Sequence, residues 1–216
     1  MLSCLVLGGT GLVGRRLLSQ LMGDLNFSPV HSLSRRQTGL VDQKLSEFIT
    51  PLDQMDSLPK AFCCDVVFCC LGTTIKSAGS KEKFKMVDYH YPLMAAKLAL
   101  AAGARRFVLV SALGADPDSR VFYSRVKGEL ERDLMALGFS ELIIIRPSVL
   151  DGPRSESRPG EALGILLGRL ITPLMRGGWA KYRPTKIDEL AALMRGLAKG
   201  EHCNGQIEYQ KLKQGQ

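Results

Sequence analysis

The 216-residue sequence predicts one α/β domain, in which a doubly wound parallel sheet lies between two layers of helices. Three observations support this three-layer α/β/α class. Strand and helix signals alternate along the chain, as expected of a parallel sheet covered on both faces. The run Asp65-Val-Val-Phe-Cys-Cys-Leu71 is apolar without alternation, which is typical of a strand buried on both sides. No repeat or true linker divides the chain, whose length fits a single domain (1–216).

Apolar periodicity and turn residues predict the individual elements. The expected strands are 2–7, 30–34, 45–49, 65–71, 106–111, 141–146 and 205–209. The expected helices are 12–22, 80–102, 122–138, 160–175 and 187–199. The segment 35–64 is too short for two crossover helices, so one crossover is expected to be a loop or single turn around 52–61. Residues 151–200 are expected to form a small substrate-covering part of the same domain.

Composition limits the function classes. Hydrophobic residues (45%) can fill a core, and no apolar run reaches the length of about 20 residues that a membrane helix needs. The net charge of +8 comes from scattered residues without an aromatic-interleaved basic stripe, so no nucleic-acid partner is expected. The six cysteines lack metal-ligand spacing; Cys69 and Cys70 are interpreted as small core residues, and no metal site is expected. The chain begins without a basic leader, so a cytoplasmic location is expected.

The most informative motif is Gly8-Gly9-Thr10-Gly11-Leu12-Val13-Gly14, directly after the apolar run 2–7 and before a helical apolar pattern. Glycines at this spacing allow a tight turn, close approach of the backbone to a pyrophosphate, and packing of the helix against the strand. The phosphate then meets free N–H groups at the start of the helix. The motif predicts a Rossmann-like dinucleotide site; a purely structural turn is the alternative.

Two further segments fit such a site. Arg35 and Arg36 follow the second strand, where an acidic residue would hold the 2′-hydroxyl of NAD and an arginine accommodates the 2′-phosphate of NADP. They favour NADP(H), although they could also be an exposed pair in a loop. Leu71, Gly72, Thr73 and Thr74 end the fourth strand, where the ligand crevice of an open α/β sheet lies. These four residues could line the cofactor or form a plain turn.

Tyr123-Ser-Arg-Val-Lys127 places a phenol and an ammonium four residues apart, on one face of a helix. A neighbouring cation favours the phenolate, so Lys127 is expected to lower the pKa of Tyr123 from its ordinary value of about 10. Tyr123 would then exchange protons near neutral pH. The spacing alone occurs by chance in many proteins, but it gains weight from the glycine motif that precedes it.

Together these residues resemble the atypical branch of the short-chain dehydrogenase/reductase superfamily and, within it, the Tat-interacting-protein-like NAD(P)-binding oxidoreductases. The segments that carry the resemblance are Gly8–Gly14, Ser34–Arg36, Cys70–Thr74, Val110–Ala115, Tyr123–Glu129, Arg146-Pro147 and Ser155–Glu161. The resemblance implies that Tyr123 is the acid/base, Lys127 its ribose-binding partner, and Ser111 the residue that positions the substrate oxygen. It also implies that Arg146 and Pro147 line the nicotinamide side of the cofactor.

The chain departs from this family pattern at two positions. A pair of adjacent hydroxyl residues often follows the fifth strand, and here the pair reads Ser111-Ala112. An asparagine of the preceding long helix corresponds, in a loose alignment, to Asp88. Both departures leave cofactor binding intact but put turnover in doubt. In the loop 151–161, Arg154 and Arg158 could meet an acidic group of the substrate or be solvated.

The sequence therefore predicts an NADPH-binding oxidoreductase that reduces a small carbonyl substrate, or oxidises an alcohol, with a Tyr/Lys acid–base pair. The alternative is a non-catalytic NADPH-binding protein with a regulatory or redox-sensing role. A homodimer or a protein partner is plausible from the resemblance alone, and no membrane association is expected.

Overall fold

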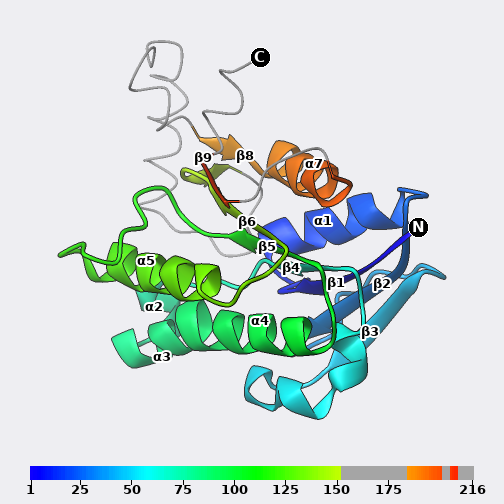
Figure 1. The fold of residues 1–216 in the computed structure, drawn as a ribbon, viewed down its shortest axis with the longest axis horizontal. Coiled ribbons are helices and arrows are strands. Elements are labelled where there is room, and N and C mark those ends of the chain that lie inside the picture. Colours follow the sequence, from blue (N-terminus) through cyan, green and yellow to red (C-terminus); the bar gives the residue numbers. More distant parts are fainter. Residues whose placement is uncertain (152–183, 201–204, 209–216) are drawn as a thin grey trace.

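The computed structural model describes residues 1–151, 184–200 and 205–208, and it confirms the predicted fold class. Within these ranges, seven strands form one sheet in the order β3-β2-β1-β4-β5-β6-β9, and every neighbouring pair is parallel (Figure 1). The strands are β1 (Leu2–Leu7), β2 (Phe27–Ser34), β3 (Leu45–Ile49), β4 (Val66–Cys69), β5 (Arg106–Val110), β6 (Glu141–Arg146) and β9 (Gly205–Glu208). The direction of chain progression reverses between β1 and β4, which makes this the topological switch point of the sheet.

Helices cover both faces of the sheet, as Figure 1 shows. Helices α1 (Leu12–Met22) and α7 (Ile187–Ala198) lie on one face, where they pack against each other. Helices α4 (Tyr91–Ala101) and α5 (Phe122–Met135) lie on the other face. None of the helices in the described ranges is long and apolar enough to span a membrane.

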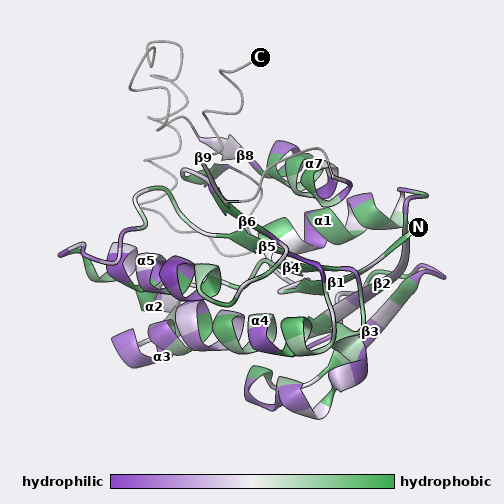
Figure 2. Ribbon diagram, in the orientation of Figure 1, coloured by the Kyte–Doolittle hydropathy of each residue, from purple (hydrophilic) through white to green (hydrophobic). Residues whose placement is uncertain are grey.

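Strand residues alternate between two apolar cores, because neighbouring side chains of a strand point to opposite faces. In β4, Val66 and Phe68 pack into the core under α1 and α7, whereas Val67 and Cys69 pack into the core under α4 and α5. All four side chains are buried. Figure 2 shows the hydrophobic residues along the sheet and on the helix faces that meet it. Burial on both faces explains why these strands read as continuous apolar runs.

The expected helix 80–102 is a composite in the structure. It contains α3 (Lys81–Lys85), a π-helical segment η3 (Met86–His90) and then α4, and the short helix α2 (Ile75–Ala78) precedes it. π-Helical segments inside α-helices are rare and occur frequently at functional sites. The wider turn places the carboxylate of Asp88 inside the protein, where the residue is fully buried. The apolar spacing of the sequence gives no sign of this local change in pitch.

The remaining expectations differ from the structure mainly at element boundaries. The crossover from β3 to β4 consists of two short 3₁₀ helices, η1 (Leu52–Ser57) and η2 (Pro59–Phe62), which confirms the expected turn around 52–61. β2 begins at Phe27 rather than at residue 30, and α5 ends at Met135 rather than at residue 138. The expected helix 160–175 lies outside the described residues, as do Arg154, Arg158 and Cys203.

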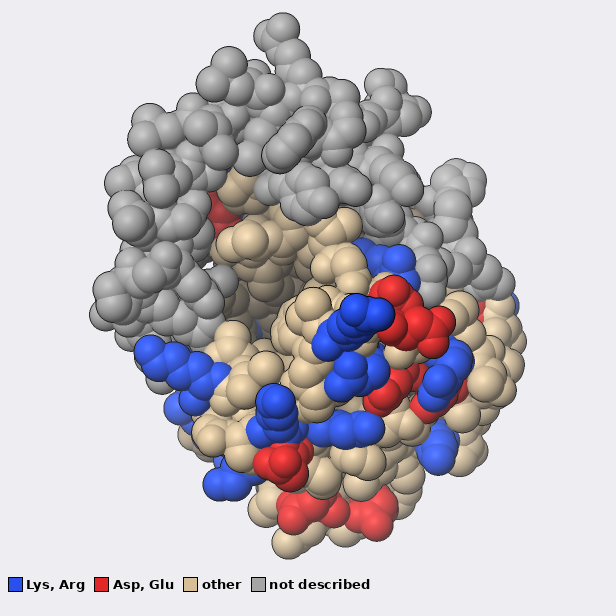
Figure 3. Space-filling model, turned by 90° about the vertical axis from the view of Figure 1, so that its left-hand side faces the viewer, with Lys and Arg blue, Asp and Glu red and all other residues tan. Residues whose placement is uncertain are grey.

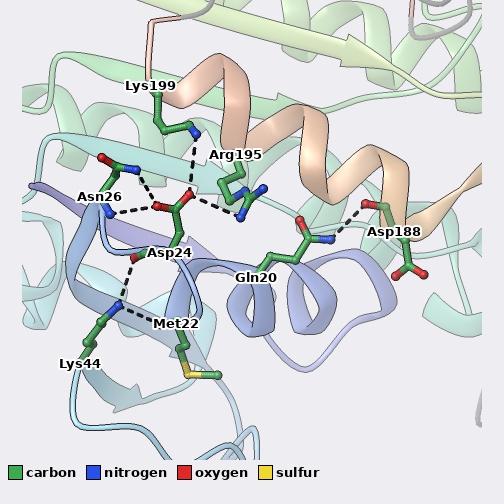
Figure 4. Close-up of polar contacts among 8 residues, drawn as sticks. All are labelled: Gln20, Met22, Asp24, Asn26, Lys44, Asp188, Arg195 and Lys199. Carbon is green, nitrogen blue, oxygen red and sulfur yellow. Dashed lines mark hydrogen bonds and ion pairs between the residues drawn. The ribbon is translucent and has the colours of Figure 1, made fainter.

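A cluster of charges joins α7 to the loop that follows α1, at the end of α1 distant from the glycine turn (Figure 4). One carboxylate oxygen of Asp24 accepts hydrogen bonds from the backbone N–H (2.9 Å) and the side-chain amide (2.7 Å) of Asn26. The other oxygen lies 3.4 Å from Arg195 and 3.7 Å from Lys199, both of which belong to the last turn of α7 or follow it. These contacts fix the end of α7 to the loop that follows α1.

A second, two-stranded sheet pairs β7 (Leu150–Asp151) with β8 (Thr185–Lys186). The hydroxyl of Thr185, a fully buried residue, accepts the backbone N–H of Ser148 at 3.2 Å and lies 3.1 Å from the Ser148 hydroxyl. This pairing was not expected from the sequence, because two-residue strands carry no periodic signal. It holds the chain segment that follows β6 in a fixed position.

Candidate functional site

Two cavities lie at the carboxyl edge of the sheet, on either side of the switch point between β1 and β4. Their volumes are about 510 and 640 Å³. Both cavities are lined by Thr10 and Gly11 of the glycine turn and by residues 70–73 after β4. Figure 3 shows that this end of the molecule is hollowed and that Lys and Arg side chains gather beside the hollow. The two cavities therefore form adjoining halves of one site, in the position where open α/β sheets bind ligands.

The glycines of the turn have different physical roles. Gly8 has a φ of +82°, which side chains rarely adopt, and a Cβ there would lie 2.8 Å from the carbonyl oxygen of Cys70. A Cβ on Gly14 would lie 2.3 Å from the Gly8 carbonyl oxygen, so Gly14 lets α1 pack directly on the turn. Gly11 is exposed and lines both cavities, and a Cβ there would meet only the Gly8 carbonyl, at 3.2 Å. Gly11 is therefore the position at which a ligand can approach the backbone.

Gly9 belongs to the packing group as well. A Cβ at this position would come within 2.6 Å of the Ser32 hydroxyl and 2.7 Å of a Leu18 methyl. Leu12 and Val13, at the start of α1, line the smaller cavity. The turn thus presents Thr10 to Val13 to the site, while Gly8, Gly9 and Gly14 allow it to pack.

The smaller cavity brings together most of the residues expected at the reacting end of the cofactor. Its lining includes Tyr123 and Lys127 from α5, Ser111 and Ala112 after β5, residues 71–74 after β4, and Pro147 after β6. These segments lie far apart in the sequence, and the parallel sheet brings them to one edge. Tyr123 packs against the ring of Phe84, with 5.5 Å between the ring centroids.

Lys127 forms an ion pair with Asp88 at the base of this cavity. The ammonium Nζ lies 2.7 Å from Oδ1 of Asp88, and the two side chains are only 4% and 1% exposed. Oδ2 of Asp88 accepts the backbone N–H of Thr73 at 2.8 Å. Burial raises the pKa of Asp88, although Lys127 opposes this shift. Burial alone would lower the pKa of Lys127, but the Asp88 carboxylate raises it above its ordinary value.

The expected effect of Lys127 on Tyr123 is wrong in its net direction. Burial raises the pKa of Tyr123 above 10; the positive charge of Lys127 works against this shift, and the negative charge of Asp88 adds to it. The sequence suggested an isolated ammonium beside the phenol. In the structure the ammonium is paired with a carboxylate, so it no longer stabilises the phenolate strongly enough to outweigh burial.

Ser111 takes part in a second buried network. Its hydroxyl donates a hydrogen bond to Glu131 of α5, and Glu131 forms an ion pair with Arg146. The Nε of Arg146 lies 3.1 Å from both carboxylate oxygens of Glu131. Arg146 does not line the cavity, whereas Pro147 does. The guanidinium of Arg146 thus supports Ser111 through Glu131 and does not itself line the cavity, whereas the resemblance implied that it lines the nicotinamide side.

The larger cavity contains the residues expected to select the cofactor. Arg35 and Arg36 line it together with Ser34, whose hydroxyl donates to the Arg36 carbonyl at 2.7 Å and so fixes the turn after β2. Both arginines are exposed. Sequence reasoning missed residues 51–53 and Lys83, which also line this cavity. The signal that could have identified 51–53 is their position directly after β3, at the carboxyl edge of the sheet.

Gly128 is another residue that sequence reasoning missed. It follows Lys127, and a Cβ there would lie 2.2 Å from backbone atoms of Asp116 and Pro117. The loop after β5 therefore crosses α5 in direct backbone contact, and the Asp116 N–H donates to the Ser124 carbonyl at 3.1 Å. This contact fixes the loop after β5 against the helix that carries Tyr123 and Lys127.

The two cysteines near the site have different environments. Cys69 is fully buried, and burial raises the pKa of its thiol to about 12. Cys70 is partly exposed and lines both cavities, so the interpretation as a core residue holds for Cys69 but not fully for Cys70. The five cysteines in the described part of the chain are free thiols.

Residues 8–159 match a family of proteins described as NAD(P)H-binding. The chain is 39% identical over 211 residues to "Protein HTATIP2" of Rattus norvegicus, covering 95% of this chain and 84% of that protein. It is 34% identical over 189 residues to "Protein fmp52, mitochondrial" of Aspergillus niger, covering 82% of this chain and 80% of that protein. Among solved structures, the Bordetella bronchiseptica enzyme WbmG in complex with NAD has a TM-score of 0.69 at 15% identity, covering 95% of this chain and 71% of that one.

These comparisons correct one expectation and establish the family. Several fungal relatives carry the word "mitochondrial" in their names, so the expected cytoplasmic location is wrong; the first residues of the sequence were not a sufficient basis for it. The structural likeness at 15% identity shows the fold. The family match spans most of the chain, and the rat relative is similar over nearly all of it. The chain belongs to the NAD(P)H-binding family of atypical short-chain dehydrogenases/reductases.

Proposed function

We propose that the protein is an NADPH-dependent oxidoreductase that reduces a small carbonyl compound. The observation that carries this proposal is the convergence of Tyr123, Lys127 and Ser111 on the cavity that also contains the glycine turn. These are the residues that a family of this kind uses to transfer a proton to or from a substrate oxygen. Tyr123 and Lys127 share α5, Ser111 follows β5 and the glycine turn follows β1, so the sheet brings three segments of the chain together at this cavity.

The residues present fit a dinucleotide. Gly11 leaves its backbone open to a pyrophosphate, since its missing side chain faces the site rather than the protein. Gly72 leaves a similar opening over Lys127 and Asp88, because a Cβ there would meet them only at 3.8 and 3.5 Å. Lys127 can therefore reach hydroxyl groups of a ribose placed at this opening. When bound, the nicotinamide supplies the hydride.

Tyr123 then supplies the proton. Its side chain lines the cavity together with Ser111, whose hydroxyl can orient a carbonyl oxygen when its proton turns from Glu131 to the substrate. Ser111 is held by Glu131, so its position does not depend on the substrate. The apolar residues of the cavity, among them Val110 and Leu150, suit a substrate with an apolar body.

The preference for NADPH rests on Arg35 and Arg36, and a fluorescence titration with NADPH and NADH in parallel tests it. We expect NADH to bind about tenfold more weakly, since a charge-assisted hydrogen bond contributes about 1.5–3 kcal/mol and 1.4 kcal/mol corresponds to tenfold in affinity. The double variant Arg35→Ala/Arg36→Ala should remove the difference between the two nucleotides. Arg132→Ala, an exposed arginine on α5, is the matched control and should retain it. Equal binding of both nucleotides by the wild type would refute the preference for NADPH.

A second candidate function is a non-catalytic, NADPH-binding regulator. Two observations favour it: Ala112 stands at one of the paired hydroxyl positions, and the Ser111 hydroxyl is already bonded to Glu131. Tyr123→Phe distinguishes the two functions once a carbonyl substrate has been found by screening. In an enzyme, Tyr123→Phe should lower turnover about 100-fold or more and leave the NADPH affinity unchanged. The reason is that a positioned proton donor contributes about 10²–10⁴-fold to the rate. A regulator would show no turnover in the wild type, so Tyr123→Phe would have no turnover to remove.

A further inference from the structure

We propose that Asp88, by pairing with Lys127, offsets the positive charge beside Tyr123 and so helps burial to keep Tyr123 a neutral phenol, which can donate a proton. The first part concerns only the residues of this chain. The second part, that proton donation serves carbonyl reduction, rests on the proposed function.

The geometry of Asp88 carries the proposal. The π-helical segment turns its carboxylate inward, where one oxygen lies 2.7 Å from the Lys127 ammonium and the other accepts the Thr73 N–H at 2.8 Å. Lys127 lies one helical turn after Tyr123 on α5. The positive charge nearest to Tyr123 is therefore paired with a negative charge that is fixed by the backbone of another segment. The two charges of this ion pair largely cancel in their electrostatic effect on the Tyr123 hydroxyl.

Among the described residues, Lys127 and Asp88 are the charged groups that act on the pKa of Tyr123. From α3, Phe84 contributes an apolar ring against the tyrosine. From β4, the Cys69 thiol lies near the pair, and burial keeps its pKa high, so it remains uncharged. The next buried charges, Glu131 on α5 and Arg146 on β6, neutralise each other. Burial then decides the state of the phenol, and it favours the uncharged form.

The neutral state has a chemical consequence. A phenol can give its proton to a carbonyl oxygen: the O–H bond of Tyr123 breaks, an O–H bond forms on the substrate, and solvent later returns a proton to the phenolate. Oxidation of an alcohol needs the reverse, a phenolate that accepts a proton. With Asp88 in place, the phenolate is scarce near neutral pH. Asp88 is therefore a positioning residue that acts through Lys127.

The test is a spectrophotometric titration of tyrosine ionisation, which needs neither substrate nor cofactor. The chain contains five tyrosines, so the signal of Tyr123 is obtained as the difference between the wild type and Tyr123→Phe. The same difference is measured in the Asp88→Asn background. Circular dichroism at each pH confirms that the proteins remain folded. We expect the wild-type midpoint above the ordinary value of about 10 and a midpoint about 1–3 pH units lower in Asp88→Asn, where Lys127 is unpaired.

Asp24→Asn is the matched control, because Asp24 also accepts N–H groups and lies beside cations, yet does not line either cavity. It should leave the Tyr123 midpoint unchanged. An unchanged midpoint in Asp88→Asn, or an equal shift in Asp24→Asn, overturns the proposal. If Asp88→Asn does not fold, the wild-type curve decides, since a midpoint at or below 10 contradicts a neutral pair beside the phenol. Failure to bind NADPH would refute the proposed function but would leave this titration unaffected.

Discussion

Asp24 and Asp88 lie in different parts of the molecule and both pair with cationic side chains, but their pKa values shift in opposite directions. Asp24 lies in the loop after α1, where hydrogen bonds from Asn26 and the charges of Lys199 and Arg195 lower its pKa (Figure 4). Asp88 lies at the base of the smaller cavity, where burial raises its pKa despite the ion pair with Lys127. The residue type and the type of partner are the same. Both side chains are buried, but hydrogen bonds from Asn26 outweigh burial at Asp24, whereas burial outweighs the ion pair and the hydrogen bonds at Asp88.

The contacts around each of the two aspartates indicate its role in the protein. Around Asp24, each polar contact joins one element to another: Lys44 donates to the carbonyls of Met22 and Asp24 at 2.9 and 3.1 Å, and Gln20 donates to the carbonyl of Asp188 at 3.1 Å (Figure 4). These contacts hold α7 and the start of β3 to the end of α1. Asp88, in contrast, contacts Lys127 and Thr73, and all three residues line the smaller cavity. We infer that the Asp24 cluster serves stability and that the Asp88 pair serves the site.

The same distinction separates two glycines and gives the largest expected effect. Gly14→Ala should lower the free energy of unfolding by about 1–3 kcal/mol, because its Cβ would lie 2.3 Å from the Gly8 carbonyl and the backbone must move. Gly72→Ala should leave the free energy of unfolding within about 0.5 kcal/mol of the wild type. It should weaken NADPH binding about tenfold, since the new methyl group covers Lys127 and Asp88.

Urea denaturation and NADPH titration of both variants check this prediction. The comparison fails if Gly72→Ala binds NADPH as tightly as the wild type, because Gly72 would then be only a turn residue. It also fails if Gly14→Ala is as stable as the wild type, because the turn would then tolerate a side chain against α1.

The sequence predicted the parts of this arrangement that are local. The glycine turn, the Tyr123–Lys127 spacing and the strand ends all depend on residues close together in the chain, and their periodicity or spacing is visible. The pairing of Lys127 with Asp88 was not predictable, because it depends on a π-helical turn and on contact between segments 39 residues apart. The direction of the Tyr123 pKa shift was missed for the same reason. Burial and the second charge come from tertiary structure.

Arg146 and Gly128 show the same limit. The sequence placed Arg146 correctly at the end of β6, but its partner Glu131 lies on α5 and no motif joins them. Gly128 looks like an unfavourable glycine within a helix, and only the crossing of residues 116 and 117 explains it. Long-range contacts of this kind leave no periodic signal. They determine how the site is held, whereas the local motifs determine which residues reach it.

The smallest expected effect concerns Asp24, and it tests whether its cluster serves stability alone. Because the folded state lowers the pKa of Asp24, its carboxylate contributes stability above the ordinary value of 3.8, and this contribution is lost as the pH falls through the lowered value. Asp24→Asn should therefore be about 1 kcal/mol less stable near neutral pH. The difference from the wild type should shrink in acid.

Asp56→Asn, a change of an exposed carboxylate on η1, is the control and should show no such convergence. Urea denaturation across this pH range measures both, and NADPH affinity at neutral pH should be the same for all three proteins. A loss of NADPH affinity in Asp24→Asn would mean that the α1–α7 cluster also shapes the site, and the separation between the two aspartates would not hold.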